Sequence, residues 1–430
     1  MFTKRAKSKE SNVRPTQTNS SKPTTLLSTL STPFFMPILG SGLCRQNVLL
    51  LRRLRDVPLT AHRTFQARTG RRTFTVLGFE SSADDTCAAV VTSSRQILSN
   101  VVVKQHDLHE GFGGIHPSVA IEAHQRNMPG AVRMALEQAC ISIHDIDGIA
   151  FTRGPGIGGC LSVGSNAAKS LAAALGKPLV GVHHMQAHAL TPLLTTPTAD
   201  LPQFPFLTLL ISGGHTLLLL ASSLTSFQIL ATTADASIGR AFDKTARALG
   251  LSWGTRGPGA ALEELCRVTN DELESLPGIQ PFTVPMPGKL AFSFASLQSS
   301  VERYISLMEE PLSSSHKIAL ARAFQAAAAR QLCAKLRLSL HKLELKNVIV
   351  RDVVVSGGVA SNIFLREKLR AALDEYSPDE RISLHFPPLE LCTDNAAMIA
   401  WASMHRFLAG DYDDYTVDLR AKWSIEDIRI

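Results

Sequence analysis

The stretch FPFLTLLISGGHTLLLL, from Phe204 to Leu220, joins two apolar runs through one short turn. Each run has the length and composition of a buried β-strand, so the pattern predicts a strand, a glycine turn and a strand. A similar unit occurs earlier, where RTFTVLGFE (Arg72–Glu80) leads through a polar turn into TCAAVVT (Thr86–Thr92). Helical sequence follows both units. We therefore expect an α/β protein with two similar lobes, mixed sheets flanked by helices, and a cleft between the lobes.

The chain divides into four predicted segments: a basic head at 1–72, lobe I at 73–200, lobe II at 201–393, and a helical segment at 394–430 that returns to lobe I. A long helix is expected at 316–343, because apolar residues recur there every four positions. These residues are Leu320, Phe324, Ala328, Leu332, Leu336 and Leu340. Other helices are expected at 118–140, 160–176, 236–250, 258–268, 361–373 and 394–409.

Charge is unevenly distributed between the head and the body of the chain. The whole chain carries +7, but residues 1–72 hold 14 Lys and Arg against two acids, which leaves the body at −5. A basic, hydroxyl-rich, acid-poor head predicts a disordered mitochondrial transit peptide; the alternative is a basic tail that binds nucleic acid. The seven cysteines are scattered without a CxxC pair, and no apolar run reaches the length of a membrane span.

Four turns follow predicted strands and carry glycine or hydroxyl residues. They are GFESSADDT (Gly78–Thr86), GPGIGG (Gly154–Gly159), LISGGHT (Leu210–Thr216) and SGGVASN (Ser356–Asn362). Such turns present backbone N–H groups to an anion, which favours phosphate binding. The first also carries Asp84 and Asp85, acids suited to moving a proton, although a polar hairpin turn is the plainer interpretation.

Three histidines lie in VGVHHMQAHAL (Val180–Leu190). On a helix, His184 and His188 share one face, a spacing that suits two imidazoles on one metal ion. Glutamate does not follow in the HExxH pattern of a metalloprotease, and buried or surface histidines remain the alternative. A third ligand would come from elsewhere, and Asp394 in CTDNAAM (Cys392–Met398) is a candidate. Asp243 in GRAFDKTARALG either complements a helix dipole or accepts the hydroxyls of a ribose.

Six motifs, in order, resemble the tRNA N6-adenosine threonylcarbamoyltransferase family, mitochondrial branch, over residues 76–423. They are GFESSADDT, VHHMQAH, LLISGGHT, AFDKTA, GGVASN and CTDNAAMIA. Some positions depart from the family pattern: Ala83 replaces a cysteine, Gln186 and Ala187 replace Glu-Gly, and Gln298 replaces a lysine. The predicted ligand histidines and Asp394 are intact.

The resemblance implies a two-lobed, actin-like ATPase fold and one divalent metal ion per subunit, iron or zinc, held by His184, His188 and Asp394. It implies that the donor, threonylcarbamoyl-adenylate, is bound by Leu210, Ile211, Ser212, Gly213, Gly214, Asp243, Gly257 and Asn362. The implied reaction transfers the threonylcarbamoyl group to N6 of the adenosine 3′ of the anticodon, in tRNAs that read codons beginning with A. A mitochondrial homodimer without a membrane anchor is expected.

Two further expectations concern catalysis and tRNA binding. Asp84 is our candidate for the group that accepts the proton of the adenine amine. One face of the 316–343 helix, with Lys317, Arg330, Lys335 and Lys342, is a candidate tRNA contact, although an ordinary solvated face is equally compatible with the sequence. Rival functions are an actin-fold small-molecule kinase, a metalloprotease and a non-catalytic nucleotide-binding scaffold. A kinase would not require the two histidines and the aspartate, the missing glutamate of HExxH argues against a protease, and a scaffold would bind the adenylate without turnover.

Overall fold

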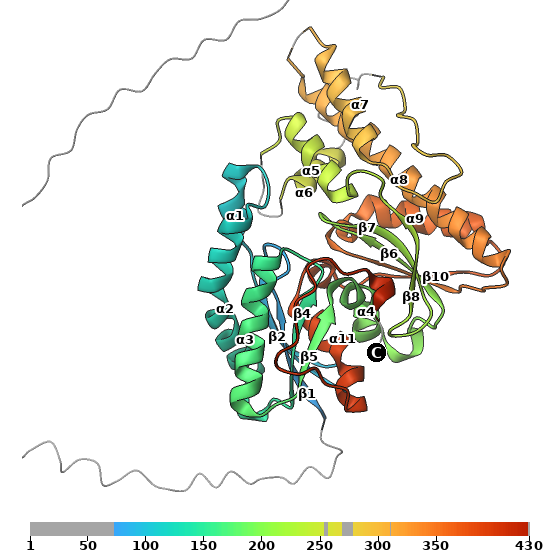
Figure 1. Cartoon of the computed structure of the whole chain (residues 1–430). Helices are drawn as coiled ribbons and strands as arrows, with labels where there is room; N and C mark the ends of the chain where they lie inside the picture. Colours follow the sequence, from blue (N-terminus) through green and yellow to red (C-terminus); the bar gives the residue numbers. More distant parts are fainter. Residues whose placement is uncertain (1–72, 253–256, 269–277, 310, 429–430) are drawn as a thin grey trace, which may run out of the picture. The chain divides into compact units, whose positions relative to one another are not determined.

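A computed structural model of the chain describes residues 73–252, 257–268, 278–309 and 311–428 (Figure 1). These residues belong to one compact unit that spans Gly70–Ile430. The predicted transit peptide at 1–72 lies outside the described residues. Two five-stranded sheets organise the unit.

The first sheet has the strand order β3-β2-β1-β4-β5. Its strands are β1 (Thr75–Glu80), β2 (Thr86–Thr92), β3 (Ile97–Val103), β4 (Gly148–Gly154) and β5 (Leu179–His183). The first three strands pair antiparallel, whereas β1, β4 and β5 run parallel. The sheet is therefore mixed, as the sequence predicts.

The second sheet repeats this topology, with the strand order β10-β9-β6-β7-β8. Its strands are β6 (Phe206–Ile211), β7 (Thr216–Ala221), β8 (Phe227–Thr232), β9 (Asp352–Ser356) and β10 (Ser383–His385). Again three strands pair antiparallel, and β6, β9 and β10 run parallel. The two units of strand, turn and strand thus occupy equivalent places, which confirms the predicted likeness of the two halves.

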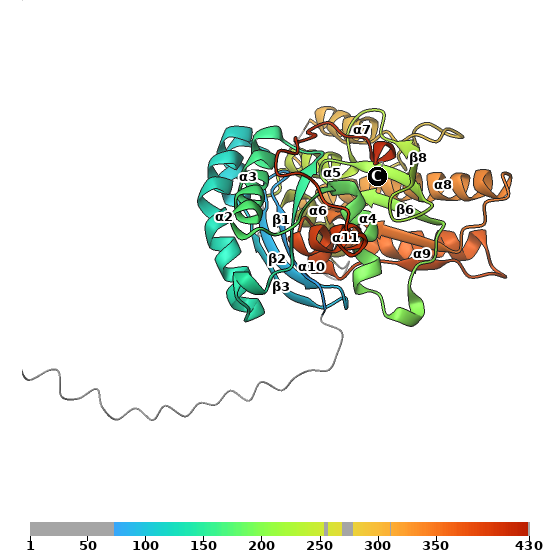
Figure 2. The same cartoon turned by 60° about the horizontal axis from the view of Figure 1, so that its bottom comes forward.

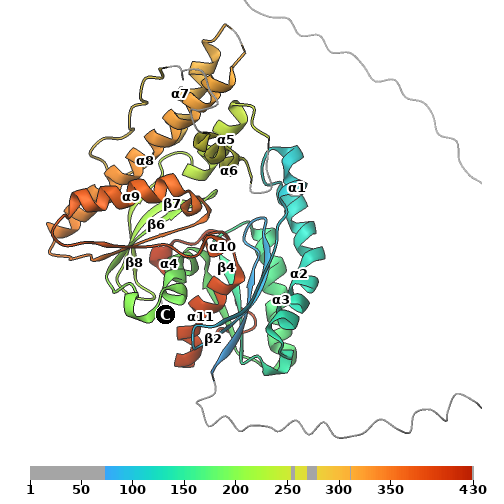
Figure 3. The same ribbon diagram turned by 180° about the vertical axis from the view of Figure 1, so that it is seen from behind.

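Helices cover both faces of the first sheet, which explains why strands such as β2 are buried along their whole length. On one side lie α2 (Pro117–Ala139) and α3 (Gly158–Leu175), and on the other lies α11 (Ala396–Ala409) (Figures 1 and 3). The approach of α11 is close: a Cβ on Gly78 would lie 2.6 Å from the carbonyl oxygen of Ala396. Gly78 therefore allows the C-terminal helix to pack on β1.

The second sheet packs its two faces into different cores because side chains alternate along a strand. Leu207, Leu209 and Ile211 of β6 join the core formed with the helices of this half. Phe206 and Leu210 face α4 (His184–Thr195) and α11, which lie between the sheets (Figure 2). The helices of this half are α5 (Ile238–Ala248), α6 (Pro258–Arg267), α7 (Ala295–Ser306), α8 (Ser314–Glu344) and α9 (Ile363–Tyr376).

Helix α8 confirms the predicted apolar stripe, since all six of its residues lie in the core of the second half. The cationic face predicted on the same helix is wrong at Lys335. This side chain is only 1% exposed, and its ammonium donates a hydrogen bond to the carbonyl oxygen of Met286. Lys335 lies between Leu332 and Leu336 in the stripe, so burial of the helix also buries its aliphatic stem. The four cations do not form one exposed surface.

Candidate metal and donor site

Two histidines from α4 and an aspartate from the start of α11 come together between the sheets. Oδ1 of Asp394 lies 3.0 Å from Nε2 of His188 and 3.5 Å from Nε2 of His184. The three residues form a group that can hold a metal ion. Zinc–nitrogen bonds of about 2.0–2.1 Å in a tetrahedral site place ligand atoms about 3.4 Å apart, so these distances fit one ion. Two neutral imidazoles and a carboxylate suit iron or zinc.

Glu80 orients the first of these histidines from the end of β1. Its fully buried carboxylate lies 3.0 Å from Nδ1 of His184 and also accepts hydrogen bonds from the Ser82 N–H and the Thr152 hydroxyl. The ring is therefore fixed with Nδ1 toward Glu80 and Nε2 toward Asp394. A carboxylate that holds the far nitrogen of a ligand histidine selects its tautomer and raises its basicity.

The neighbouring carboxylates and imidazoles of this group shift one another's pKa values toward the charged forms. Burial disfavours a charged imidazole, but Glu80 and Asp394 outweigh it and raise the pKa of His184 to about 10. Burial likewise opposes ionisation of Asp394, yet His184 and His188 hold its pKa well below the ordinary value. The two carboxylates and one imidazolium leave the site with a net negative charge, which a bound cation would neutralise.

His183, the first histidine of the stretch, has a structural role. Its Nδ1 accepts hydrogen bonds from the backbone N–H groups of Met185 and Gln186 and so caps α4. Its Nε2 lies 3.2 Å from the carbonyl oxygen of Trp423, to which it donates. Burial lowers the pKa of His183 to about 3, so the ring stays neutral. The cap fixes the start of α4 and with it the direction of the two ligand histidines.

The β1–β2 turn brings Asp84 to the same region. Ser82 in this turn has its hydroxyl 3.3 Å from Nδ1 of His184. Burial, together with the charge of Asp394, raises the pKa of Asp84, while His106 at 3.8 Å opposes the rise. Asp84 stays partly accessible, with 19% of its side chain exposed. A carboxylate with a raised pKa is a better proton acceptor than an ordinary aspartate.

The β6–β7 turn offers a backbone surface rather than side chains. Leu210 and Ile211 have their side chains buried in the two cores, so only their main chain can reach a ligand. Gly213 and Gly214 are exposed, and a Cβ on either would meet no atom within 4 Å in the described part of the chain. Packing does not require glycine here, whereas close approach of a ligand to the backbone would.

Other contacts hold this turn from behind. The Ser237 hydroxyl donates to the Gly213 carbonyl oxygen, and the Gly239 N–H donates to that of Ser212 at 3.2 Å. Ser212 closes the turn, because its hydroxyl accepts the N–H of His215 at 3.0 Å. These hydrogen bonds fix the backbone conformation of the turn, including its open side.

Of the remaining predicted donor residues, Asp243 lies within α5, and Gly257 and Asn362 directly precede α6 and α9. Oδ1 of Asp243 accepts the Gly259 N–H at 3.0 Å, and burial raises the pKa of Asp243 to about 6. Gly257 precedes α6 with a φ of 85°, a conformation that favours glycine. Asn362 caps α9 through the Leu365 N–H at 3.0 Å. Its side chain is 4% exposed, so the Asn362 side chain is engaged within the protein.

Two predicted phosphate turns have structural explanations. In GPGIGG, a Cβ on Gly154 would collide with the carbonyl oxygen of Arg420, and one on Gly156 would lie 2.6 Å from that of Ser82. Gly357, with a φ of 97°, lies against the carbonyl oxygen of Ile211 at 2.5 Å from a built Cβ. Close packing accounts for these glycines without a ligand.

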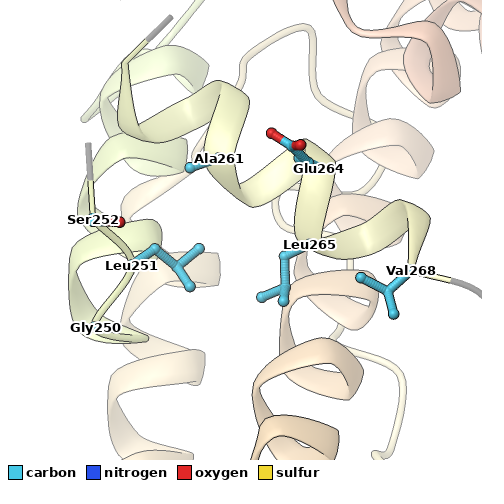
Figure 4. Close-up of a pocket in the computed structure, with 7 residues that line it drawn as sticks. All are labelled: Gly250, Leu251, Ser252, Ala261, Glu264, Leu265 and Val268. Carbon is cyan, nitrogen blue, oxygen red and sulfur yellow. The ribbon is translucent and has the colours of Figure 1, made fainter. Parts of the chain in front are cut away.

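A separate pocket of about 370 Å³ lies between the end of α5 and α6 (Figure 4). Its lining residues are Gly250, Leu251, Ser252, Ala261, Glu264, Leu265 and Val268. None of the residues predicted for metal, donor or proton transfer lines it. The residues predicted for metal binding and proton transfer therefore lie elsewhere, around α4 and the β1–β2 turn.

Sequence reasoning missed Glu80, the partner of His184. The signal available was its place at the end of a buried strand, since a glutamate there needs a partner. Among the described helices, none combines the length and hydrophobicity that crossing a membrane requires.

Comparisons with known proteins agree on the family. The family described as "TsaD: tRNA N6-adenosine threonylcarbamoyltransferase" matches residues 96–401. A protein of that name from Paramagnetospirillum magneticum is 39% identical, over 82% of this chain and 97% of its own. The Schizosaccharomyces pombe protein named "tRNA N6-adenosine threonylcarbamoyltransferase, mitochondrial" is 37% identical, over 91% of this chain and 96% of its own.

A solved structure supports the fold. HypF from T. kodakarensis aligns with a TM-score of 0.50 at 15% identity, over 79% of this chain and 48% of that one. Together with the repeated sheet topology, this confirms the predicted two-lobed, actin-like ATPase fold. From the family match over residues 96–401 and the relatives that align along nearly their whole length, the chain belongs to the tRNA N6-adenosine threonylcarbamoyltransferase family and is a transferase.

Proposed function

We propose that the protein moves the threonylcarbamoyl group from threonylcarbamoyl-adenylate to N6 of the adenosine 3′ of the anticodon, in mitochondrial tRNAs that read codons beginning with A. The observation that carries this proposal is the convergence of His184, His188 and Asp394 beside a turn with an available carboxylate, Asp84. The S. pombe relative named as mitochondrial and the basic head at 1–72 support the compartment.

The donor would bind across the second half of the molecule. Gly213 and Gly214 leave open space beside the turn, so the phosphate of an adenylate could approach their backbone closely. Asp243, ionised at neutral pH with a pKa of about 6, would accept the ribose hydroxyls. The backbone around Gly257 and Asn362 would complete the site. We infer that these groups orient the donor but do not attack it.

His184, His188 and Asp394 would hold one iron or zinc ion, with Glu80 fixing the His184 ring. Such an ion would supply Lewis-acid chemistry for the departure of the phosphate. The Gly213 and Gly214 amides would add fixed dipoles for the same developing charge.

The transfer itself forms one bond and breaks one. The N6 nitrogen of adenine bonds to the carbamoyl carbon, the bond from that carbon to the phosphate oxygen breaks, and AMP leaves with the electron pair. One N6 proton must depart as the new bond forms. We assign its acceptance to Asp84, whose raised pKa and partial exposure suit a general base. The protein is not required to form a covalent intermediate, since the donor is already an activated anhydride.

The test is a transfer assay with the purified full-length protein as a homodimer, threonylcarbamoyl-adenylate and unmodified tRNA, without other proteins. We expect modified nucleoside in tRNAs that read codons beginning with A, and none in a tRNA with another base 3′ of the anticodon. Absence of product with all tRNAs, in protein that contains metal, would contradict the proposal. Product only after bacterial accessory proteins are added would contradict self-sufficiency alone.

A further inference from the structure

A group of cations surrounds an indole beside the metal site. The guanidinium of Arg153, at the end of β4, lies 5.6 Å from the centre of the Trp423 ring, and that of Arg420 lies 5.0 Å from it. Lys422 is exposed on the same segment. We call Arg153, Arg420, Lys422 and Trp423 the Trp423 patch. Its cations stand out on a body whose net charge is negative.

The backbone of this segment is tied to the chemical centre. The Trp423 carbonyl oxygen accepts the hydrogen bond of His183, and the two rings lie 4.7 Å apart. His184 is the next residue along the chain. The Ala421 carbonyl oxygen accepts the Gly156 N–H at 3.1 Å. Gly156 in turn packs against Ser82 of the β1–β2 turn. The patch therefore borders both the ligand helix and the turn that carries Asp84.

The figures show the same placement. The C-terminal segment, dark red, runs beside β4 and β5 toward α4 (Figures 1 and 2). Two backbone bonds hold it there, from the Arg420 N–H to the Arg153 carbonyl oxygen and from the Asp413 N–H to that of Leu179. The segment is fixed to the first sheet, so its side chains have a defined position relative to the site.

Two cations of the patch, Arg420 and Lys422, form no ion pair among the described residues, whereas Asp413 and Asp418 lie near Arg153. Arg406 nearby forms ion pairs with Asp411 and Asp413, so it offers little charge to a ligand. By contrast, neither Arg420 nor Lys422 has a carboxylate partner in the described ranges. Both are exposed. Stacking on Trp423 would restrict the Arg420 guanidinium and leave its N–H donors for a ligand outside the protein.

We propose that the Trp423 patch binds the phosphate backbone of the RNA substrate next to the reacting adenosine. This inference rests on the proposed function, which requires that an RNA loop reach the site. Arginine and lysine contacts to phosphates supply affinity and position without reading sequence. The patch meets this need at the rim of the site, whereas the cations predicted on α8 include a buried lysine.

The test measures tRNA binding by the full-length protein at several salt concentrations. The variant is Arg420→Ala with Lys422→Ala, and the matched control is Lys346→Ala with Arg381→Ala, two exposed cations in the second half. Both double variants remove the same charge. We expect about tenfold weaker tRNA binding in the first pair only, with the slope of log Kd against log salt reduced by about 1.5. Arg420→Lys keeps the positive charge and should therefore retain the salt slope of the wild type.

Three readouts separate the outcomes. If the Arg420→Ala, Lys422→Ala variant had the same dissociation constant and salt slope as the control pair, the proposed RNA contact would be wrong, whatever the transfer assay gives. Loss of polyglutamate binding with unchanged tRNA binding would also overturn it, since the patch would then recognise an acidic protein. Wild-type protein that binds tRNA with the expected salt slope but transfers nothing would contradict the proposed function, not the patch. The affinity for threonylcarbamoyl-adenylate should be the same in all variants.

Discussion

The β1–β2 turn and the β6–β7 turn occupy equivalent places in two sheets of the same strand order, yet their chemistry differs. The first carries carboxylates, with Glu80 buried against His184 and Asp84 partly exposed. The second carries Gly213 and Gly214, which face open space and offer only backbone. The first turn thus supplies ionisable side chains, and the second supplies backbone amides.

A repeated topology therefore constrains where a polar turn lies, but not what the turn does. In the first sheet, the return of α11 brings Asp394 to α4, so acids and histidines meet there. In the second, Ser237 and Gly239 brace the turn from behind, which fixes its N–H groups. Substitutions in the first half should therefore affect metal and proton transfer, and substitutions in the second should affect donor binding.

The largest effect is expected from Asp394→Ala. It removes the only carboxylate of the proposed ligand set, so bound metal should fall to background, and transfer should fall on the order of a thousandfold, more than the loss typical of outer-sphere partners. Metal analysis of the purified protein checks this, with Asp374→Ala, at an exposed position of α9, as the control. Full metal content in Asp394→Ala protein would refute the ligand assignment.

The next effect is expected from Asp84→Asn. The amide cannot accept the N6 proton, so single-turnover transfer should slow about a hundredfold or more, while metal content and donor affinity stay unchanged. Rapid-quench kinetics measures the step, and Asp107→Asn on the exposed surface of α1 (His106–His109) serves as the control. Undiminished transfer would exclude Asp84 as the base.

Glu80→Gln should weaken metal binding by about 10- to 100-fold, because it removes the charge that orients His184. The pKa of His184, raised to about 10 in the metal-free protein, means that the ring is charged at pH 7. Metal binding must then release that proton, so affinity should rise with pH toward 10. Calorimetry in buffers of different ionisation enthalpy measures the release. Equal proton release in Glu80→Gln and in the wild type would contradict this role.

The smallest effect is expected at Asp243 in the second half, on the affinity for the donor. Burial raises the pKa of Asp243 to about 6, so the carboxyl becomes protonated between pH 7 and pH 5 and loses acceptor capacity. Affinity for a stable donor analogue should fall up to about tenfold over this range in the wild type and stay constant in Asp243→Asn. Because folding binds this proton more tightly, the residue also costs stability as pH rises from about 4 to 6. If the affinity of Asp243→Asn fell with pH as it does in the wild type, Asp243 would have no part in donor binding.

The sequence predicts much of this arrangement because several signals are local. Two apolar runs around SGGH define β6 and β7, and the HxxxH spacing places two imidazoles on one face of α4. Asp394 lies 206 residues beyond His188, so the sequence offers it only as a candidate ligand, and the family resemblance is what assigns it to the pair. Proximity of that kind depends on how α11 packs on β1, which no local pattern contains.

Other features depend on pairing or packing and escaped prediction. Strand β8 is partly exposed and β10 has three residues, so neither shows a clear alternation. Helix α7 is rich in serine, which weakens its helical signal. The bond between Glu80 and His184 crosses from β1 to α4, and it emerges only when the sheet and helix are assembled.

Anomalous X-ray diffraction of crystals of the metal-loaded protein would locate the one ion that we assign to two imidazoles and a carboxylate. The account predicts a single strong peak about 2.0–2.2 Å from Nε2 of His184, Nε2 of His188 and the carboxylate of Asp394. A metal-replete protein whose anomalous peak lies away from these three side chains would contradict it.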